Sequence, residues 1–133
     1  MKPKRSILFV CVENAGRSQM AEAFMRSMAA DRFDSYSAGS KPGKAINPVV
    51  AEAMKEKGID ISANKPKGFG DLPLKDFDVL VTMGCGDTCP FYPSAKQISW
   101  NIDDPKGKSI DEVRGIRDAI RSRAEELLRD IDK

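Results

Sequence analysis

The sequence predicts an α/β fold of three layers, in which a four-stranded parallel sheet of strand order 2-1-3-4 carries helices on both faces. Short apolar runs alternate with amphipathic segments along the chain, and this alternation favours parallel strands joined by crossover helices. Such crossovers are right-handed, which makes 2-1-3-4 the natural strand order once two helical layers are required. With 133 residues, 41% hydrophobic and 32% charged, residues 1–133 are expected to form a single domain.

The first half of the chain predicts two strand–helix pairs. An apolar run over 6–12 predicts the first strand, and hydrophobic residues at helical spacing predict a helix over 18–30. A second strand is expected over 33–37. A second helix is expected over 47–58, because the segment begins with the good cap asparagine, continues with proline and ends with glycine.

The second half of the chain predicts two further strands and a long helix. Residues 59–75 are rich in glycine, proline and lysine and are typical of a loop, with or without a short helix. Strands are expected over 77–83 and 95–100. Ser109 is expected to cap a final helix whose apolar residues recur on one face.

The segment between the first strand and the first helix has the composition of an oxyanion-binding loop, Cys11-Val12-Glu13-Asn14-Ala15-Gly16-Arg17-Ser18. Consecutive backbone N–H groups and the positive end of the helix that follows would surround a tetrahedral oxyanion. Arg17 would donate to two of its oxygens. The same field favours the thiolate form of Cys11. We therefore predict that the loop binds an oxyanion and that Cys11 attacks it.

The chain contains three cysteines and no histidine. Without histidine, Ser-His and Cys-His catalytic pairs and most zinc-hydrolase sites are excluded. The predicted strand order places the end of the third strand beside that of the first, so Cys85 and Cys89 are expected on the same rim as Cys11. Three such thiols suit a relay by thiol–disulfide exchange. The alternative of three packed cysteines with no common role stays open, as does which of Cys85 and Cys89 would attack Cys11 first.

Asp103-Asp104-Pro105 follows the fourth predicted strand and therefore falls on the same rim. A carboxylic acid there would protonate an oxygen that leaves the oxyanion. An aspartate before proline is equally typical of a turn. Spacing alone does not separate these two interpretations.

Composition and charge exclude several classes of protein. A net charge of +2 without a basic stripe argues against a nucleic-acid-binding protein. The basic residues 1–5 are followed by only six apolar residues, too few for a signal peptide or a membrane span. The sequence therefore predicts a cytoplasmic protein, and a monomer, because the pattern contains no large exposed apolar patch.

Taken together, these motifs identify a resemblance to thioredoxin-coupled arsenate reductases built on the low-molecular-weight protein tyrosine phosphatase fold. The likeness covers nearly the whole chain. It rests on the loop from Cys11 to Ser18 with Gln19-Met20-Ala21-Glu22, and on Ser37-Ala38-Gly39, Asn47-Pro48, Asp60-Ile61-Ser62, Val81-Thr82-Met83, Cys89-Pro90, Trp100 with Asp103-Asp104-Pro105, Val113-Arg114 and Arg117-Asp118.

The resemblance implies that arsenate is reduced to arsenite. Cys11 would form the thiol–arsenic adduct, and Asp104 would be the general acid. Cys85 would attack Cys11 and release arsenite, and Cys89 would then form a disulfide with Cys85. Thioredoxin, or another dithiol reductant, would reduce that disulfide. The resemblance also implies that three loop residues shape the site: Asn14, Arg17 and Ser18.

The chain departs from better-known members of this family in three respects. Only three residues separate the two relay cysteines, where those members have six, and Ala15-Gly16 stands where some carry a further cysteine. No tightly bound cofactor is implied, but some members bind a potassium ion near the loop. Asn14, Glu22 and Ser37 match the positions involved, while the remaining acidic ligand has no match.

Two other functions remain open. A low-molecular-weight tyrosine phosphatase needs only Cys11, Arg17 and an aspartate, although such enzymes usually follow Asp-Pro with tyrosine, where this chain has Lys106. The other is a non-enzymatic module that binds an oxyanion or switches through its thiols, which the fold alone does not exclude.

Overall fold

The computed structural model describes residues 4–84 and 94–131. Its four strands are β1 (Arg5–Cys11), β2 (Phe33–Gly39), β3 (Phe77–Thr82) and β4 (Ser94–Ser99). They pair in parallel in the order β2-β1-β3-β4. The predicted strand order is therefore confirmed, and the end of β1 lies between the ends of β2 and β3.

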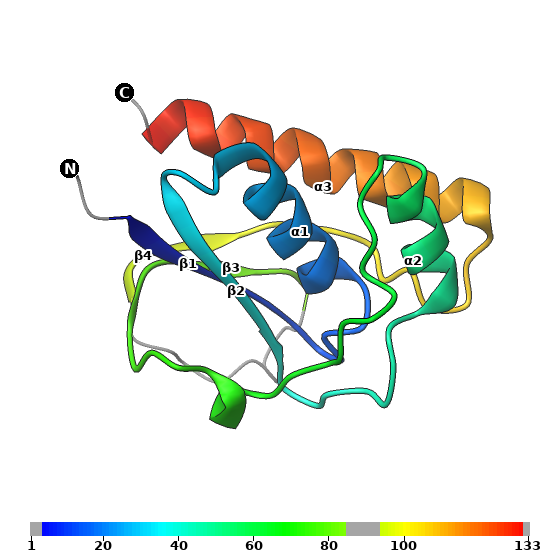
Figure 1. Cartoon of the computed structure of the whole chain (residues 1–133), viewed down its shortest axis with the longest axis horizontal. Coiled ribbons are helices and arrows are strands. Elements are labelled where there is room, and N and C mark those ends of the chain that lie inside the picture. The colour runs from blue at the N-terminus through cyan, green and yellow to red at the C-terminus, as the bar shows by residue number, and fades with distance from the viewer. Residues whose placement is uncertain (1–3, 85–93, 132–133) are drawn as a thin grey trace.

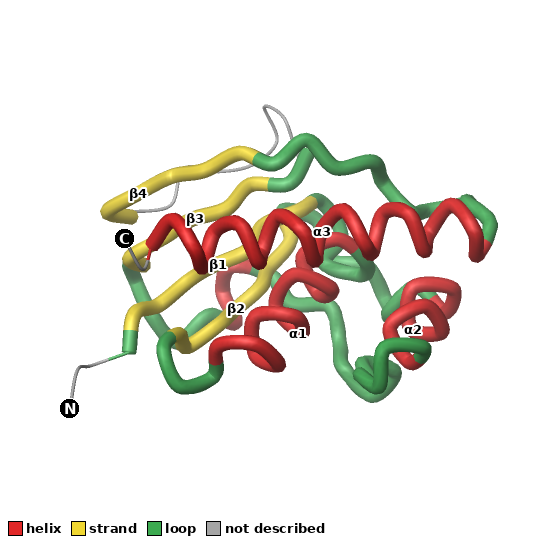
Figure 2. Tube along the Cα trace, turned by 90° about the horizontal axis from the view of Figure 1, so that it is seen from above, coloured by secondary structure: helices red, strands yellow, loops and turns green. Residues whose placement is uncertain are grey.

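In the described ranges the α-helices are α1 (Arg17–Ala29), α2 (Pro48–Lys55) and α3 (Ile110–Ile131). All of them lie on one side of the sheet (Figures 1 and 2). On the other side, the described chain contributes the 3₁₀ helix η1 (Phe69–Asp71) and its flanking loop. Within the described residues, the two layers expected around the sheet are thus unequal, because the segment around η1 is too rich in glycine, proline and lysine for a long helix.

The side chains of β1 alternate between two separate hydrophobic cores. Ile7, Phe9 and Cys11 belong to the large cluster that packs beneath the helices, while Leu8 and Val10 belong to the small cluster on the other face. Successive side chains of a strand point to opposite faces, so the register of β1 fixes the direction of each residue. Cys11 is consequently the last residue of β1 whose side chain points toward the helices, and the loop that leads to α1 follows it.

The helix ends follow local chemistry. Asn47 caps α2: its Oδ1 accepts from the backbone N–H of Val49 at 2.9 Å. α2 ends at Lys55, before the expected Gly58, because the last turn closes with Gly58 at φ 76°. Ser109 caps α3 as predicted, with Glu112 Oε1 accepting from its backbone N–H at 3.2 Å. None of the helices in the described ranges is both long and apolar enough to cross a bilayer.

A cluster of charged residues joins α2 to α3. Glu56 accepts hydrogen bonds from Arg114 Nη2 and from Arg117 Nη1, each at 2.7 Å. These hydrogen bonds, first from Arg114 and then from Arg117, lower the pKa of the Glu56 carboxyl from 4.5 to about 2. The carboxylate therefore links the two helices in its ionised form.

Replacing Glu56 by glutamine is expected to destabilise the protein at neutral pH and to matter progressively less in acid. Because the folded-state pKa lies below the ordinary value of 4.5, the carboxylate stabilises the fold fully above about pH 4.5, and this contribution is lost as the pH falls toward 2. Urea unfolding of the two proteins between pH 7 and pH 3 measures the difference. Glu52→Gln, which changes an exposed carboxylate of α2, is the control. An unchanged difference between pH 7 and pH 3 would contradict this assignment.

Candidate active site

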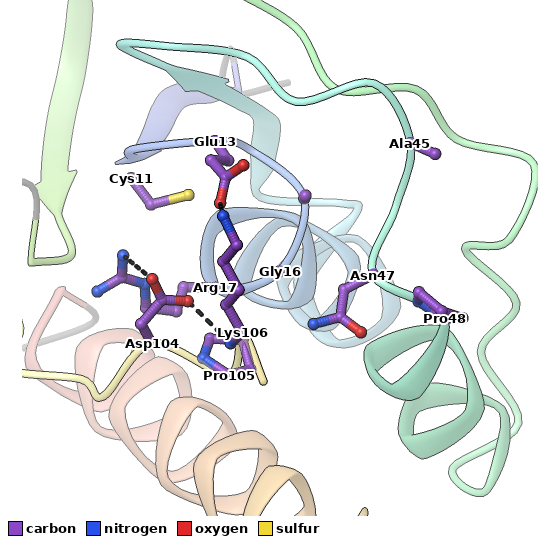
Figure 3. Close-up of a pocket in the computed structure, with 11 residues that line it drawn as sticks. Cys11, Glu13, Gly16, Arg17, Ala45, Asn47, Pro48, Asp104, Pro105 and Lys106 are labelled. Carbon is purple, nitrogen blue, oxygen red and sulfur yellow. Dashed lines mark hydrogen bonds and ion pairs between the residues drawn. The ribbon is translucent and has the colours of Figure 1, made fainter. Parts of the chain in front are cut away.

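A cavity of about 320 Å³ opens where three distant segments of the chain converge. Cys11 and Arg17 point toward the same space from the end of β1 and the start of α1 (Figure 3). The remaining walls come from the segment before α2 and from the loop after β4. Its lining residues are Cys11, Glu13, Ala15, Gly16, Arg17, Ala45, Asn47, Pro48, Asp104, Pro105 and Lys106.

The Cys11 thiol is free, and the residue is only 2% exposed. Its Sγ accepts from the backbone N–H of Asn14 at 3.3 Å and lies 2.9 Å from Ser18 Oγ. Ser18 Oγ itself accepts from Asn14 Nδ2 at 2.7 Å, so the serine hydrogen is available for the sulfur. Two polar groups, the Asn14 N–H and the Ser18 hydroxyl, therefore converge on one sulfur at the cavity, and no histidine takes part.

Asn14 organises the loop from within. It is fully buried and has φ 54°, a left-handed conformation that asparagine tolerates better than most residues. Its Oδ1 accepts from Gln19 Nε2 and from the backbone N–H of Lys67, both at 2.8 Å. These bonds hold Asn14 with its backbone N–H directed at Cys11. The shaping role implied for Asn14 by the resemblance therefore has a geometric basis.

Arg17 is fixed across the cavity. Its Nη1 donates to the carbonyl oxygen of Ile102 at 3.1 Å, and its Nη2 lies 3.8 Å from Asp104 Oδ2. The side chain is only 7% exposed. A buried guanidinium held in this way can present its remaining N–H groups to a bound oxyanion without reorganising.

Asp104 has the turn geometry that was one of its two interpretations, and its carboxyl also lies at the cavity. Its Oδ1 accepts from the backbone N–H of Lys106 at 3.0 Å, which is turn geometry. Its Oδ2 faces Arg17 across the mouth of the cavity (Figure 3), and half of the side chain is exposed. Asp103 lines a different cavity. Of the two aspartates, only Asp104 is placed where it can exchange a proton with a group bound beside Arg17.

The carbonyl groups of the Cys11–Ser18 loop are turned outward by backbone hydrogen bonds that sequence reasoning missed. N–H groups of residues 40–47 donate to them, and this leaves the loop in the orientation that an anion-binding nest needs. The bonds run from Ser40 to Cys11 (3.2 Å), Lys41 to Val12 (2.8 Å), Gly43 to Glu13 (2.9 Å) and Asn47 to Ala15 (2.9 Å).

The predicted substrate-binding residues do not all face the cavity with their side chains. Glu13, Ala15 and Gly16 line it, whereas Val12 packs with the core on the opposite face of the sheet and offers only its backbone. A Cβ on Gly16 would lie 2.8 Å from Pro105 Cγ. The glycine therefore allows the loop after β4 to close over the cavity.

A second contact missed from the sequence crosses the mouth of the cavity. Lys106 Nζ lies 3.5 Å from Glu13 Oε2, and both side chains are partly exposed (Figure 3). A sequence signal for this contact was available, because Lys106 stands where phosphatases of this fold usually have tyrosine. The ion pair places two charged groups at the mouth of the cavity.

The two other predicted thiols, Cys85 and Cys89, lie outside the described residues. The described chain stops at Gly84, which has φ 81° and lies against Arg17: a Cβ on Gly84 would collide with Arg17 Nη1. In residues 4–84 and 94–131, no three acidic or cysteine side chains are grouped so that they could hold a metal ion.

Fold and site together define the family. Residues 6–133 match the family of low molecular weight phosphotyrosine protein phosphatases, and this chain belongs to it. The match spans nearly the whole chain, as does the resemblance stated from the sequence, and the predicted phosphatase-like fold is confirmed.

Several proteins that are similar to this chain are named arsenate reductases. An arsenate reductase of Staphylococcus aureus (strain Newman) is 39% identical over 122 residues, which are 89% of this chain and 92% of the relative. A thioredoxin-dependent arsenate reductase of Corynebacterium glutamicum is 38% identical, with a TM-score of 0.78 over 98% of this chain. This chain spans 63% of that one, less than two thirds. An arsenate reductase in the phosphate binding state has a TM-score of 0.84 and 30% identity, covering 96% and 98% of the two chains.

Proposed function

We propose that this protein reduces arsenate to arsenite through a relay of three thiols, with Cys11 as the nucleophile and Cys85 and Cys89 as the relay, and that thioredoxin regenerates it. One observation carries the proposal: the Cys11 sulfur accepts a hydrogen bond from the Asn14 N–H and lies 2.9 Å from the Ser18 hydroxyl, at a cavity that Arg17 also lines. The names of the relatives add the substrate and the reductant.

In the first step, arsenate binds to the loop N–H groups and to Arg17. The Cys11 thiolate attacks arsenic, a sulfur–arsenic bond forms, and one arsenate oxygen leaves as water. Asp104 is the proton donor for that oxygen, because its carboxyl lies beside Arg17 at the cavity mouth. The oxidation state of arsenic does not change in this step.

In the second step, the Cys85 thiolate attacks the sulfur of Cys11. A sulfur–sulfur bond forms while the sulfur–arsenic bond breaks, and its electron pair stays on arsenic, which is reduced from the +5 to the +3 state and leaves as arsenite. Cys89 then attacks the sulfur of Cys85, which frees Cys11 and leaves a Cys85–Cys89 disulfide. A dithiol reductant restores both thiols.

The course of the chain supports the relay. The backbone N–H of Met83 donates to the carbonyl oxygen of Val10 at 2.8 Å, so the end of β3 lies beside the end of β1. Gly84 follows against Arg17. The first described range therefore ends at Gly84, the residue before Cys85, close to the loop that holds Cys11.

Hydrolysis of phosphotyrosine is the second candidate, since the family name and the Cys11–Arg17 pair both favour it. Three features of the described cavity argue against it as the main activity. None of its lining residues is aromatic, Lys106 occupies the place of the usual tyrosine, and Lys106 pairs with Glu13 across the mouth. A phosphatase also has no use for Cys85 and Cys89. We therefore expect only weak hydrolysis of aryl phosphates.

A coupled assay tests the proposal. The protein is mixed with thioredoxin, thioredoxin reductase and NADPH, and the oxidation of NADPH is followed with and without arsenate. We expect arsenate-dependent oxidation, and a Cys85–Cys89 disulfide when peptides of the spent enzyme are mapped by mass. Parallel reactions contain glutaredoxin with glutathione, or para-nitrophenyl phosphate. Brisk phosphate-ester hydrolysis without arsenate reduction would establish the phosphatase instead, and oxyanion binding without either reaction would establish a binding module.

A further inference from the structure

Beside the loop, three side chains form a polar cluster inside the protein: Asn14, Glu22 and Ser37. All of them are buried, with Asn14 and Ser37 fully excluded from solvent. Ser37 Oγ donates to Glu22 Oε1 at 2.5 Å. A buried carboxylate is costly without a cation or donors close to it. These are the residues at which the resemblance implied a potassium ion, so the source of the compensating charge has to be identified.

The compensating charge beside Ser37 comes from the chain itself. Lys67 Nζ lies 3.3 Å from Glu22 Oε1 and 3.3 Å from Ser37 Oγ. The other carboxylate oxygen, Glu22 Oε2, pairs with Arg26 Nη2 at 2.6 Å. Both oxygens of Glu22 thus face cationic side chains. A potassium ion at the same place would lie next to the Lys67 ammonium, and two like charges at such a separation repel each other. The residues present therefore do not fit a bound potassium ion.

The backbone of Lys67 is tied to the same loop. Its N–H donates to Asn14 Oδ1 at 2.8 Å, and its carbonyl oxygen accepts from the N–H of Gly39 at 2.8 Å. Asn14 in turn donates its N–H to Cys11 Sγ. Two hydrogen bonds therefore connect the backbone of Lys67 to Cys11. The side chain of Lys67 contacts Glu22 of α1 and Ser37 of β2.

We propose that Lys67 is a built-in monovalent cation. Its ammonium group balances the buried Glu22 carboxylate, and its backbone N–H holds Asn14 in the conformation that serves Cys11. Lys67 is accordingly a positioning residue, and the stability and activity of this chain do not depend on potassium. The part of this inference that concerns activity rests on the proposed function, whereas the part that concerns stability does not.

Lys67→Ala tests the proposal, because it removes the ammonium, keeps both backbone hydrogen bonds and opens space for an ion. Thermal unfolding is measured in potassium chloride and in tetramethylammonium chloride at equal ionic strength, without arsenate. We expect the wild-type Tm to be the same in both salts. The variant is expected to lose about 5 °C in tetramethylammonium and to recover most of that loss in potassium.

Activity is measured on the same samples. In tetramethylammonium we expect kcat/KM of Lys67→Ala to fall about tenfold, and potassium to restore it. Lys65→Ala is the matched control, because it removes an exposed lysine from the same segment and should respond to neither salt. Lys67→Gln is a second variant that replaces the ammonium with an amide oxygen, and it should gain the same potassium-specific stability.

Two results would overturn the inference. A wild-type Tm that rises specifically with potassium would show that the cluster takes an ion despite Lys67. A loss of Tm in both Lys67 variants that potassium does not restore would show that Lys67 acts through packing or its ion pair alone. If arsenate is not reduced at all, the proposed function fails, but the salt dependence of Tm still decides the role of Lys67.

Discussion

Cys11→Ser is expected to abolish arsenate reduction, whereas Cys85→Ser and Cys89→Ser are expected to stop the reaction within its first turnover. Cys11 is the thiol toward which the Asn14 N–H and the Ser18 hydroxyl converge. A serine hydroxyl at the same place is far less acidic than a thiol and gives no thiolate to attack arsenic. Each outer cysteine, by contrast, acts only after the adduct with Cys11 has formed.

Rapid quenching, with arsenite measured per enzyme molecule, separates these outcomes and resolves the order of the relay. If Cys85 attacks first, Cys89→Ser releases one arsenite and traps a Cys11–Cys85 disulfide, while Cys85→Ser stalls at the adduct. If Cys89 attacks first, the two variants exchange these results. Mass mapping identifies the trapped species. Turnover at the wild-type rate in both outer variants would disprove the relay.

Gly39→Ala is expected to lower kcat/KM for arsenate by about 100-fold or more, although residue 39 does not line the cavity. A Cβ on Gly39 would lie 2.5 Å from the carbonyl oxygen of Val12 and 2.8 Å from the backbone nitrogen of Asn14. Both are main-chain atoms, so no side-chain rotation relieves the overlap, and the loop has to move. A displacement of about 1 Å at a catalytic group costs roughly 100-fold in rate.

Steady-state kinetics and urea unfolding test this prediction together. We expect the free energy of unfolding to fall by about 1–3 kcal/mol, as for other overpacked sites. Gly115→Ala is the control, because a Cβ there meets nothing within 4 Å in α3, and alanine should stabilise that helix. Wild-type kinetics for Gly39→Ala would show that the loop tolerates the shift and that its position is not critical.

How far the sequence predicted this molecule depends on the kind of interaction. Strands and helices were predictable because periodicity and caps are local, and Asn47 and Ser109 cap the helices that they were expected to cap. The loop from Cys11 to Ser18 was also predictable, since it lies between a strand and a helix. The sharing of one cavity by Cys11 and Asp104 followed from the parallel strand order.

Other features had no local signal. The hydrogen bonds from residues 40–47 to the loop carbonyls join main-chain atoms, and side-chain identity says little about them. Lys67 reaches Glu22 across 45 positions, and nothing in its neighbours distinguishes it from the other lysines of its segment. Gly39 is the last residue of a strand, where a glycine hints at a close approach, but the sequence did not reveal which segment approaches it.

The outward-facing loop carbonyls bear on selectivity. Because the segment before α2 already holds them, the loop is ordered without a ligand, and binding of the proposed oxyanion would require little further ordering of the chain. A rigid binding loop would distinguish anions by size and charge, and phosphate is nearly the same as arsenate in both respects. Phosphate should therefore compete for the same binding site. Selectivity for arsenate would then come from the chemical step, because arsenic accepts a sulfur nucleophile more readily than phosphorus does.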